Sequence, residues 1–307
     1  MTRRGWVLFG MMCVIWGIPY LLIRVAVRDL APGTLVFART AIGGLILLPL
    51  ALTRGGYRPV LRRWPWLLAF TAIEIAGPWL LLGSAEKHLS SSLTGLLVAA
   101  VPLIGVVVAR VSGEDDPVDL ARASGLVLGI AGVAMLVGLD FGQVKVGSLV
   151  ELLFVVIGYA VAPAIMARHL ADLPSIPVVS ASLLLCAIGY LPYALARPPH
   201  HVAGNVIASV IVLGVICTAL AFVVFFALIA DIGPARATVI TYVNPAVALL
   251  FGIVLLNEKF TVGMGIGFPL ILAGSVLAAR RSKVPEVGID AVPIAEPIGP
   301  VLACDDA

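Results

Sequence analysis

Charged residues are scarce in this sequence. Asp, Glu, Lys and Arg make up only 12% of its 307 residues, whereas 61% are hydrophobic and the mean hydropathy is +1.11. A soluble domain needs about a quarter of its residues charged to solvate its surface. The composition therefore excludes a soluble globular protein and indicates an integral membrane protein, whose surface faces hydrocarbon.

The signatures of several other function classes are missing as well. The basic residues are scattered between apolar segments and the net charge is only +3, so no nucleic-acid partner is expected. Neither a nucleotide-binding loop nor a Ser/His/Asp set is present, which argues against an ATP-driven pump. The four cysteines lack metal-ligand spacing, and we expect neither a metal site nor a cofactor. They are interpreted as small apolar side chains: Cys13, Cys186, Cys217 and Cys304.

What remains is a series of apolar segments divided by charged links. Ten segments have about the twenty residues that a helix needs to cross roughly 30 Å of hydrocarbon. The predicted spans cover residues 5–25, 34–53, 65–84, 90–110, 120–139, 148–167, 176–196, 205–230, 235–256 and 262–279. The first segment follows Arg3 and Arg4 but lacks a convincing cleavage site, so it is interpreted as a span and not as a signal peptide. The fold class predicted is an all-α integral membrane protein with ten transmembrane helices.

The distribution of basic residues predicts the orientation. Thirteen of the twenty Lys and Arg residues fall on the side of the N-terminus and six on the opposite side, with Arg39 inside a span. Because Lys and Arg concentrate in cytoplasmic links, both termini are predicted to be cytoplasmic. An even number of spans requires the same result. Residues 284–307 are predicted to form a disordered cytoplasmic tail.

The chain also matches itself at an offset of about 143 residues. The matching features are Trp16-Gly17-Ile18-Pro19 with Tyr159-Ala160-Val161-Ala162 and Pro163, Pro102 with Pro245, and residues 125–132 with 267–274 after one residue of slippage. Residues 1–139 and 140–283 are therefore predicted to form two related five-helix repeats. Five is odd, so the second half enters the membrane from the opposite side. Inverted repeats of this kind permit the alternating access of secondary transporters.

Several short motifs are typical of one family. They are Ile15-Trp16-Gly17, Pro32 followed by Arg39, Pro102, Gly233-Pro234-Ala235, Asn244-Pro245, Asn257-Glu258 and residues 267–274. With them the chain resembles, over about residues 5–280, the EamA type of the drug/metabolite transporter superfamily. The resemblance implies a ten-helix inner-membrane carrier that exports amino acids, metabolites or toxic compounds. The halves are not equivalent, because Ser182 stands opposite Arg39, and Asp115 and Asp116 crowd a loop where one Glu is usual.

Ionisable residues inside spans are costly and indicate function. Glu74 lies near the middle of the third span, where a carboxylate could take up and release protons that drive export. A carboxylate that is protonated or paired for packing alone is the alternative. Arg39, in the second span, is predicted to bind an anionic group. A structural ion pair between Arg39 and Glu151, which lies at similar depth in the sixth span, is the alternative.

Helix breaks indicate where a central cavity lies. Five prolines inside the predicted spans remove backbone hydrogen bonds: Pro19, Pro78, Pro102, Pro163 and Pro245. The predicted cavity residues beside these breaks and the two charges are Trp16, Tyr20, Arg39, Glu74, Trp79, Tyr159, Thr241, Tyr242 and Asn244. Ordinary packing of aromatic side chains and helix kinks is the alternative reading of each.

These features predict a secondary transporter and not an enzyme. Its expected partners are a small-molecule substrate, membrane lipids and protons, and it is expected to be a monomer or homodimer in the cell (inner or plasma) membrane. A membrane-embedded lipid-modifying enzyme or a non-transporting sensor is the rival hypothesis. The acidic run Glu114-Asp115-Asp116-Pro117-Val118-Asp119 resembles half of a Mg²⁺ site, but no second acidic motif accompanies it, so we interpret it as a solvated turn.

Overall fold

A computed structural model describes residues 2–111, 120–139, 145–199 and 201–279, and their secondary structure is entirely helical. Eight helical segments in these residues are long and apolar enough to cross a membrane: Arg3–Ala26, Pro32–Thr53, Trp64–Ala85, Ser91–Val111, Leu120–Gly138, Val146–Leu170, Ser175–Ala196 and Gly204–Ile232. Two shorter apolar helices follow, α15 (Ile240–Leu256) and α16 (Val262–Ala278). Together they confirm the predicted ten-helix membrane fold. The acidic run at residues 114–119, Cys304 and the predicted tail lie outside the described residues.

Three spans consist of single helices, namely α3 (Pro32–Thr53), α9 (Leu120–Gly138) and α11 (Ser175–Ala196). The other long spans are composite. They are α1 (Arg3–Gly17) with α2 (Pro19–Ala26); α5 (Trp64–Phe70), the π-helical segment η1 (Thr71–Ala76) and α6 (Gly77–Ala85); α7 (Ser91–Val98) with α8 (Val101–Val111); α10 (Val146–Ile165) with the π-helical η3 (Met166–Leu170); and α12 (Gly204–Gly214), the π-helical η4 (Val215–Leu220) and α13 (Ala221–Ile232). Short helices precede two spans, namely α4 (Arg58–Leu61) and α14 (Pro234–Ala237).

The predicted ends of the spans agree closely with the observed ones, with one exception. The ninth span was expected to run without interruption over residues 235–256, whereas α14 ends at Ala237 and α15 begins at Ile240. Residues 234–238 contain a proline, an arginine and a threonine, and the apolar run begins only at Val239. The predicted span therefore began too early.

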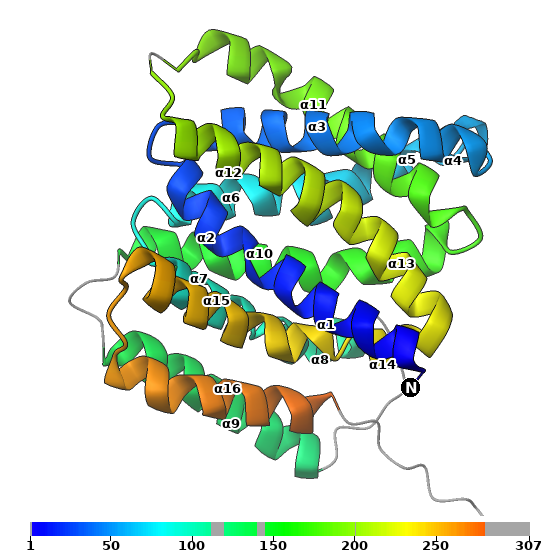
Figure 1. Ribbon diagram of the computed structural model, residues 1–307. Helices are drawn as coiled ribbons and strands as arrows, with labels where there is room; N and C mark the ends of the chain where they lie inside the picture. Colours follow the sequence, from blue (N-terminus) through cyan, green and yellow to red (C-terminus); the bar gives the residue numbers. More distant parts are fainter. Residues whose placement is uncertain (1, 112–119, 140–144, 200, 280–307) are drawn as a thin grey trace, which may run out of the picture.

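The helices pack as pairs from distant parts of the chain. In Figure 1, α9 lies along α16 at the bottom of the view, and α3 lies along α11 at the top. Between them α7 packs against α15, α2 against α12, α1 against α13 and α15, and α10 against α6. Most of the buried side chains lie at these contacts, with one large apolar cluster and three smaller ones among the described residues.

Glycines bring α9 and α16 into direct backbone contact. A Cβ atom on Gly132 would lie 2.8 Å from the carbonyl oxygen of Gly267, and one on Gly274 would lie 2.6 Å from that of Gly125. Small residues at such crossings let transmembrane helices approach closely, where van der Waals contacts hold them together. The two glycine runs that match in the sequence thus meet face to face.

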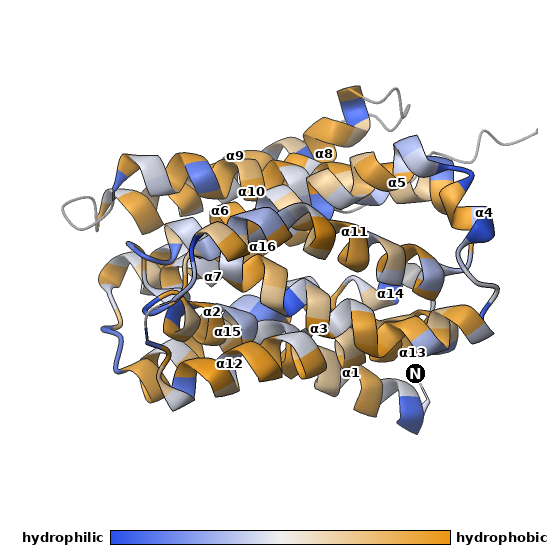
Figure 2. Cartoon of the chain, turned by 90° about the horizontal axis from the view of Figure 1, so that it is seen from above, coloured by the Kyte–Doolittle hydropathy of each residue, from blue (hydrophilic) through white to orange (hydrophobic). Residues whose placement is uncertain are grey.

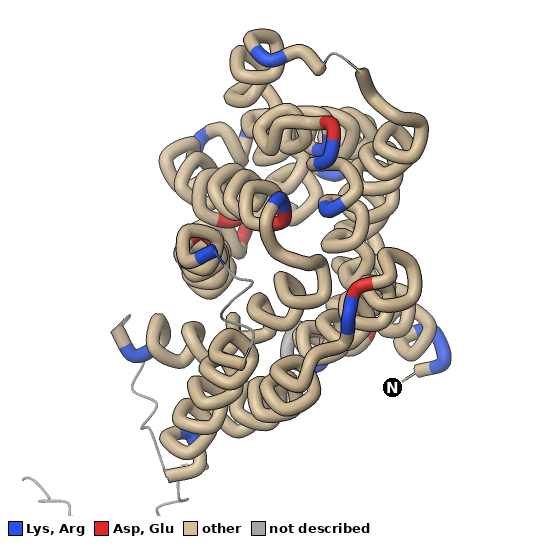
Figure 3. The backbone as a smooth tube through the Cα atoms, turned by 90° about the vertical axis from the view of Figure 1, so that its left-hand side faces the viewer, with Lys and Arg blue, Asp and Glu red and all other residues tan. Residues whose placement is uncertain are grey.

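The outer surface of the bundle is apolar. Figure 2 shows hydrophobic residues along most of the helices, and large side chains such as Leu45, Leu195 and Val254 are more than half exposed. Figure 3, in which many helices are seen end-on, shows Lys and Arg residues in the links between them. An apolar side wall with charged ends is the surface that a lipid bilayer requires.

Candidate substrate site

A buried arginine joins three spans. Arg39, on α3, is only 6% exposed. Its Cζ atom lies 3.6 Å from the ring centre of Trp79, on α6, in a cation–π contact. Its Nε donates a 2.9 Å hydrogen bond to Oγ1 of Thr218, in η4. The guanidinium is therefore held in one position by the third and eighth spans.

The remaining donors of Arg39 are free to bind a ligand. Among the described residues, its two Nη groups have neither a hydrogen-bond partner nor a carboxylate partner. A guanidinium presents these N–H groups as a planar fork that matches a carboxylate or phosphate. A buried charge left without a counter-ion is expensive. The guanidinium is therefore placed to bind an anionic group.

The structure does not contain the ion pair between Arg39 and Glu151 that was the alternative. Glu151, on α10, instead accepts a 2.7 Å hydrogen bond from Ser84 Oγ, and its second carboxyl oxygen is buried without a partner. The Trp79 stack and the Thr218 hydrogen bond direct Arg39 elsewhere. The structural pairing is thus wrong for this conformation.

Two π-helical segments shape this region. Pro78 has no N–H, so the regular hydrogen bond to the carbonyl of Glu74 cannot form, and η1 ends at the preceding turn. In the eighth span, the hydroxyl of Thr218 donates a 2.8 Å hydrogen bond to the carbonyl of Leu213, five residues earlier. This bond fixes the Thr218 oxygen as the acceptor for Arg39. π-Helical turns of this kind are frequent at functional sites.

Glu74 lies within η1, inside the third span as predicted. One of its carboxyl oxygens is buried and has no hydrogen-bond partner. In the part of the chain that the structure describes, no cation pairs with it. Glu74 does interact electrostatically with Tyr159, which also interacts with Arg39. The two charges are therefore near the same tyrosine without forming an ion pair.

Two tyrosines complete the cluster around Arg39. Tyr20, on α2, and Tyr159, on α10, both interact electrostatically with the guanidinium. Tyr159 packs in the apolar cluster that contains Trp79, and the ring of Tyr20 lies beside Gly95 of α7. Of the predicted cavity residues, the structure groups five around this region: Tyr20, Arg39, Glu74, Trp79 and Tyr159.

The other four predicted cavity residues make helix-packing contacts. Trp16 packs against the rings of Phe222 and Phe225, with its ring centre 4.7 Å from that of Phe225. The remaining three lie on α15. The exposed Thr241 hydroxyl donates a hydrogen bond to the carbonyl of Thr238 (2.7 Å), and the Tyr242 hydroxyl donates a weak one to the carbonyl of Ser275 (3.4 Å). The Asn244 side-chain amide, turned so that its nitrogen faces acceptors, donates to the carbonyls of Cys13 (3.1 Å) and Ile240 (3.0 Å).

The five prolines differ in their local effect. Three stand at helix starts after an interruption: Pro19 begins α2, Pro78 is the second residue of α6, and Pro102 is the second residue of α8. The other two lie inside helices, with Pro163 just before η3 and Pro245 within a continuous α15. The repeated pair Pro102 and Pro245 thus breaks a helix only in the first half.

Two glutamates at one end of the bundle were not among the predicted site residues. The carboxylate of Glu258 accepts hydrogen bonds from the backbone N–H groups of Ser91 (2.8 Å) and Ser92 (2.9 Å) and from their hydroxyls (3.1 and 2.6 Å). It thereby caps the first turn of α7 from the link between α15 and α16. The sequence motif Asn257-Glu258 could have indicated this cap. Asn257 forms the turn before Glu258 in a left-handed backbone conformation (φ 54°).

Glu86, directly after the third span, is fully buried. Neither of its carboxyl oxygens has a hydrogen-bond partner, while its backbone carbonyl accepts a hydrogen bond from Arg24. Burial raises the pKa of Glu86 well above its usual range, and the nearby Glu258 acts in the same direction, whereas Arg24 and Arg39 oppose the shift. No sequence signal distinguishes Glu86 from an ordinary loop residue.

Comparison with known proteins gives one consistent result. The EamA-like transporter family matches residues 3–138 and 148–280. The uncharacterized transporter YvbV of Bacillus subtilis is 25% identical over 287 residues, covering 92% of this chain and 93% of the relative. The uncharacterized inner membrane transporter YedA of Escherichia coli K12 is 26% identical over 272 residues, covering 78% of each chain. A solved crystal structure, 21% identical with a TM-score of 0.65, covers 91% of this chain and 97% of its own and shows the same fold.

Proposed function

The chain belongs to the EamA-like transporter family, and from this premise we propose that it is a secondary transporter that exports small organic molecules carrying an anionic group. It is a multi-pass membrane protein, and its relatives are named transporters. The substrate class and the direction of transport are our proposal.

The observation that carries the proposal is the state of Arg39. The guanidinium is buried, stacked on Trp79 and bonded to Thr218, yet its Nη groups have no partner among the described residues. A carboxylate on the substrate would satisfy these donors and neutralise the buried charge. Tyr20 and Tyr159, on two other spans, interact electrostatically with the guanidinium, and we propose that they contact the rest of such a molecule.

Alternating access would follow from an inverted arrangement of residues 1–139 and 140–283. The pairing of helices supports this part of the proposal. Each of the pairs α3 with α11, α7 with α15, and α9 with α16 joins a span to the one five positions later in the chain. Two halves related in this way can exchange conformations and expose the site to either side in turn. We further propose that both termini are cytoplasmic.

Proton coupling through Glu74 is a separate part of the proposal. It is supported by the position of Glu74 inside a span and by its buried, unpartnered carboxyl oxygen. Glu74→Gln should abolish the acceleration of export by a pH gradient while leaving downhill exchange intact. If a pH gradient drives the variant as well as the wild type, Glu74 is not the coupling group.

Transport by the purified protein tests the proposal directly. Proteoliposomes would be loaded with a mixture of small metabolites, with and without carboxylates, and their loss from the lumen followed by mass spectrometry. Vesicles that contain the wild-type protein should lose some carboxylated compounds faster than loaded vesicles without protein do. Arg39→Gln should remove that difference. If the wild type moves none of them, or if lipid in the vesicles is chemically altered instead, the transporter mechanism at Arg39 is refuted.

A further inference from the structure

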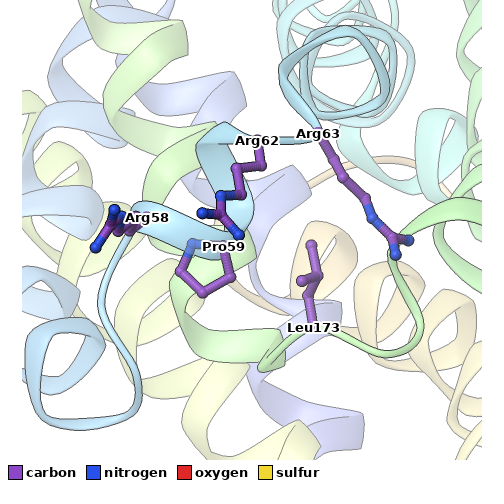
Figure 4. A pocket seen from close by; sticks show the side chains of 5 residues that line it. All are labelled: Arg58, Pro59, Arg62, Arg63 and Leu173. Carbon is purple, nitrogen blue, oxygen red and sulfur yellow. The ribbon is translucent and has the colours of Figure 1, made fainter.

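A second basic site lies at one end of the bundle, away from Arg39. Figure 4 shows a pocket of about 390 Å³ lined by Arg58, Pro59, Arg62, Arg63 and Leu173. Arg58 and Arg62 are four residues apart, as are Pro59 and Arg63. At this spacing, residues on α4 and the turn after it share one helical face. The pocket is therefore lined by three arginines from one short segment.

Hydrogen bonds and a ring stack connect the two segments that line this pocket. Arg63 donates two hydrogen bonds to the carboxylate of Asp172 (2.8 and 2.7 Å) and one to the carbonyl of His169 (2.5 Å). The ring of Trp66 stacks on that of His169, with 3.4 Å between ring centres and 3° between planes. These contacts join the link before the third span to the link after the sixth span. Arg63 and the backbone around the pocket are thus held in place.

The guanidinium groups of Arg58 and Arg62 are available to bind a ligand. Both are exposed, and neither forms a hydrogen bond or ion pair with another residue in the described ranges. The one acidic side chain bonded at the pocket, Asp172, is already occupied by Arg63. Two unpaired guanidiniums beside a neutralised third create a site for a group with one or two negative charges.

An apolar track continues from the pocket along the same segment. Leu61, at the end of α4, and Trp64 and Leu68, on α5, are 52%, 59% and 44% exposed. Trp64 and Leu68 are four residues apart and therefore lie on one face of α5. Tryptophan is enriched at the level of lipid headgroups, because its apolar ring contacts lipid while its N–H group contacts water. A soluble phosphate would contact only the pocket, whereas a lipid would contact the pocket and the track.

We propose that this pocket binds the phosphate group of an anionic phospholipid, with Arg58 and Arg62 as its ligands and the acyl chains along Leu61, Trp64 and Leu68. Such basic pockets between transmembrane helices suit lipid headgroups. The site is independent of the transport function proposed for Arg39. It would hold a lipid that stabilises the link between the second and third spans.

Native mass spectrometry of the full-length protein tests the proposal. The protein in detergent is titrated with dioleoyl phosphatidylglycerol, dioleoyl phosphatidylcholine or glycerol phosphate. One phosphatidylglycerol should bind at lower concentration than phosphatidylcholine. Each basic side chain contributes roughly a factor of five at an anionic lipid, so Arg58→Gln with Arg62→Gln should weaken binding roughly 25-fold.

The chain offers a matched control at the opposite end. Arg24, Val27, Arg28 and Lys87 line a basic pocket of about 360 Å³. Arg28→Gln with Lys87→Gln removes the same charge and should leave the phosphatidylglycerol affinity within about twofold of the wild type. An equal loss in both double variants would refute the assigned site, and equal occupancy by glycerol phosphate would refute the lipid as its ligand.

A second measurement uses the wild-type fold in case the arginine variants do not fold. Phosphatidylglycerol with brominated chains should quench tryptophan fluorescence more than brominated phosphatidylcholine does. Trp64→Phe should remove that difference. Trp6→Phe, which replaces an equally exposed tryptophan on α1, should retain it. Quenching that is equal for the two lipids, or that depends on Trp6 instead, would overturn the proposal.

Discussion

Replacing Glu258 by Gln is expected to loosen the start of α7. The native carboxylate accepts four hydrogen bonds, of 2.6 to 3.1 Å, from the backbone N–H groups and hydroxyls of Ser91 and Ser92. A carboxylate only accepts hydrogen bonds, whereas the amide of Gln has one end that donates. In the variant, that NH₂ group faces at least one N–H donor of the capped turn.

The magnitude follows from the bonds that are lost. A hydrogen bond to a charged group contributes about 1.5 to 3 kcal/mol, and a negative charge at a helix N-terminus adds about 0.3 to 1 kcal/mol. The Gln oxygen keeps part of the cap, so we expect a net loss of about 2 kcal/mol. At about 2 to 4 °C per kcal/mol for a chain approaching this size, the midpoint should fall by at least about 4 °C.

Thermal unfolding in detergent measures this change. A thiol-reactive dye reports unfolding, because Cys13, Cys186 and Cys217 are buried in the native protein. Glu151→Gln is the matched control, since that carboxylate accepts a single hydrogen bond, from Ser84, and its loss should lower the midpoint by less. If Glu258→Gln unfolds at the wild-type temperature, the capping contact does not stabilise this end of the bundle.

Three further predictions concern other contacts. Trp79→Leu should weaken substrate binding about tenfold, because it removes the cation–π attraction to Arg39, while Trp16→Leu should not; equal effects in a transport assay would contradict the assigned stack. Because burial raises the pKa of Glu86, the folded protein binds that proton more tightly, and stability should fall as pH rises from the usual carboxyl range through the raised value. Glu86→Gln should flatten this dependence. If the unfolding midpoint changes with pH equally in the variant and the wild type, Glu86 is not responsible for the dependence. Gly132→Ala should cost about 1 to 3 kcal/mol, because its Cβ would lie 2.7 Å from a backbone nitrogen of α16; Gly10→Ala, with open space around it, should show no loss in the same unfolding assay.

The sequence predicts the spans well because each is an apolar segment bounded by charges or turns. The second span was expected over residues 34–53, and α3 covers Pro32–Thr53. The break before α15 was missed because the short segment around Arg236 was counted as the start of the ninth span, although the apolar run begins only at Val239. Pro78 could have indicated η1, but the eighth span carries no proline at η4, so nothing local signalled that segment.

The candidate site could be predicted only in part, for a different reason. The cost of burying a charge identified Arg39 and Glu74. The partner of Arg39 could not be inferred, since Thr218 lies 179 positions away in the chain and is an ordinary residue in its own segment. Glu86 follows a span and resembles a loop residue. Its burial depends on packing of distant elements, which no local pattern records.

The preference of the transporter for a carboxylate tests the central claim most directly. Once a carboxylated substrate is found, its transport rate in proteoliposomes is compared with that of its primary amide, for the wild type and Arg39→Gln. We predict that the wild type prefers the carboxylate by at least about tenfold, because the amide cannot neutralise the buried guanidinium. The ratio should fall close to one in the variant. A ratio that is unchanged by Arg39→Gln would contradict the role of Arg39 in substrate binding.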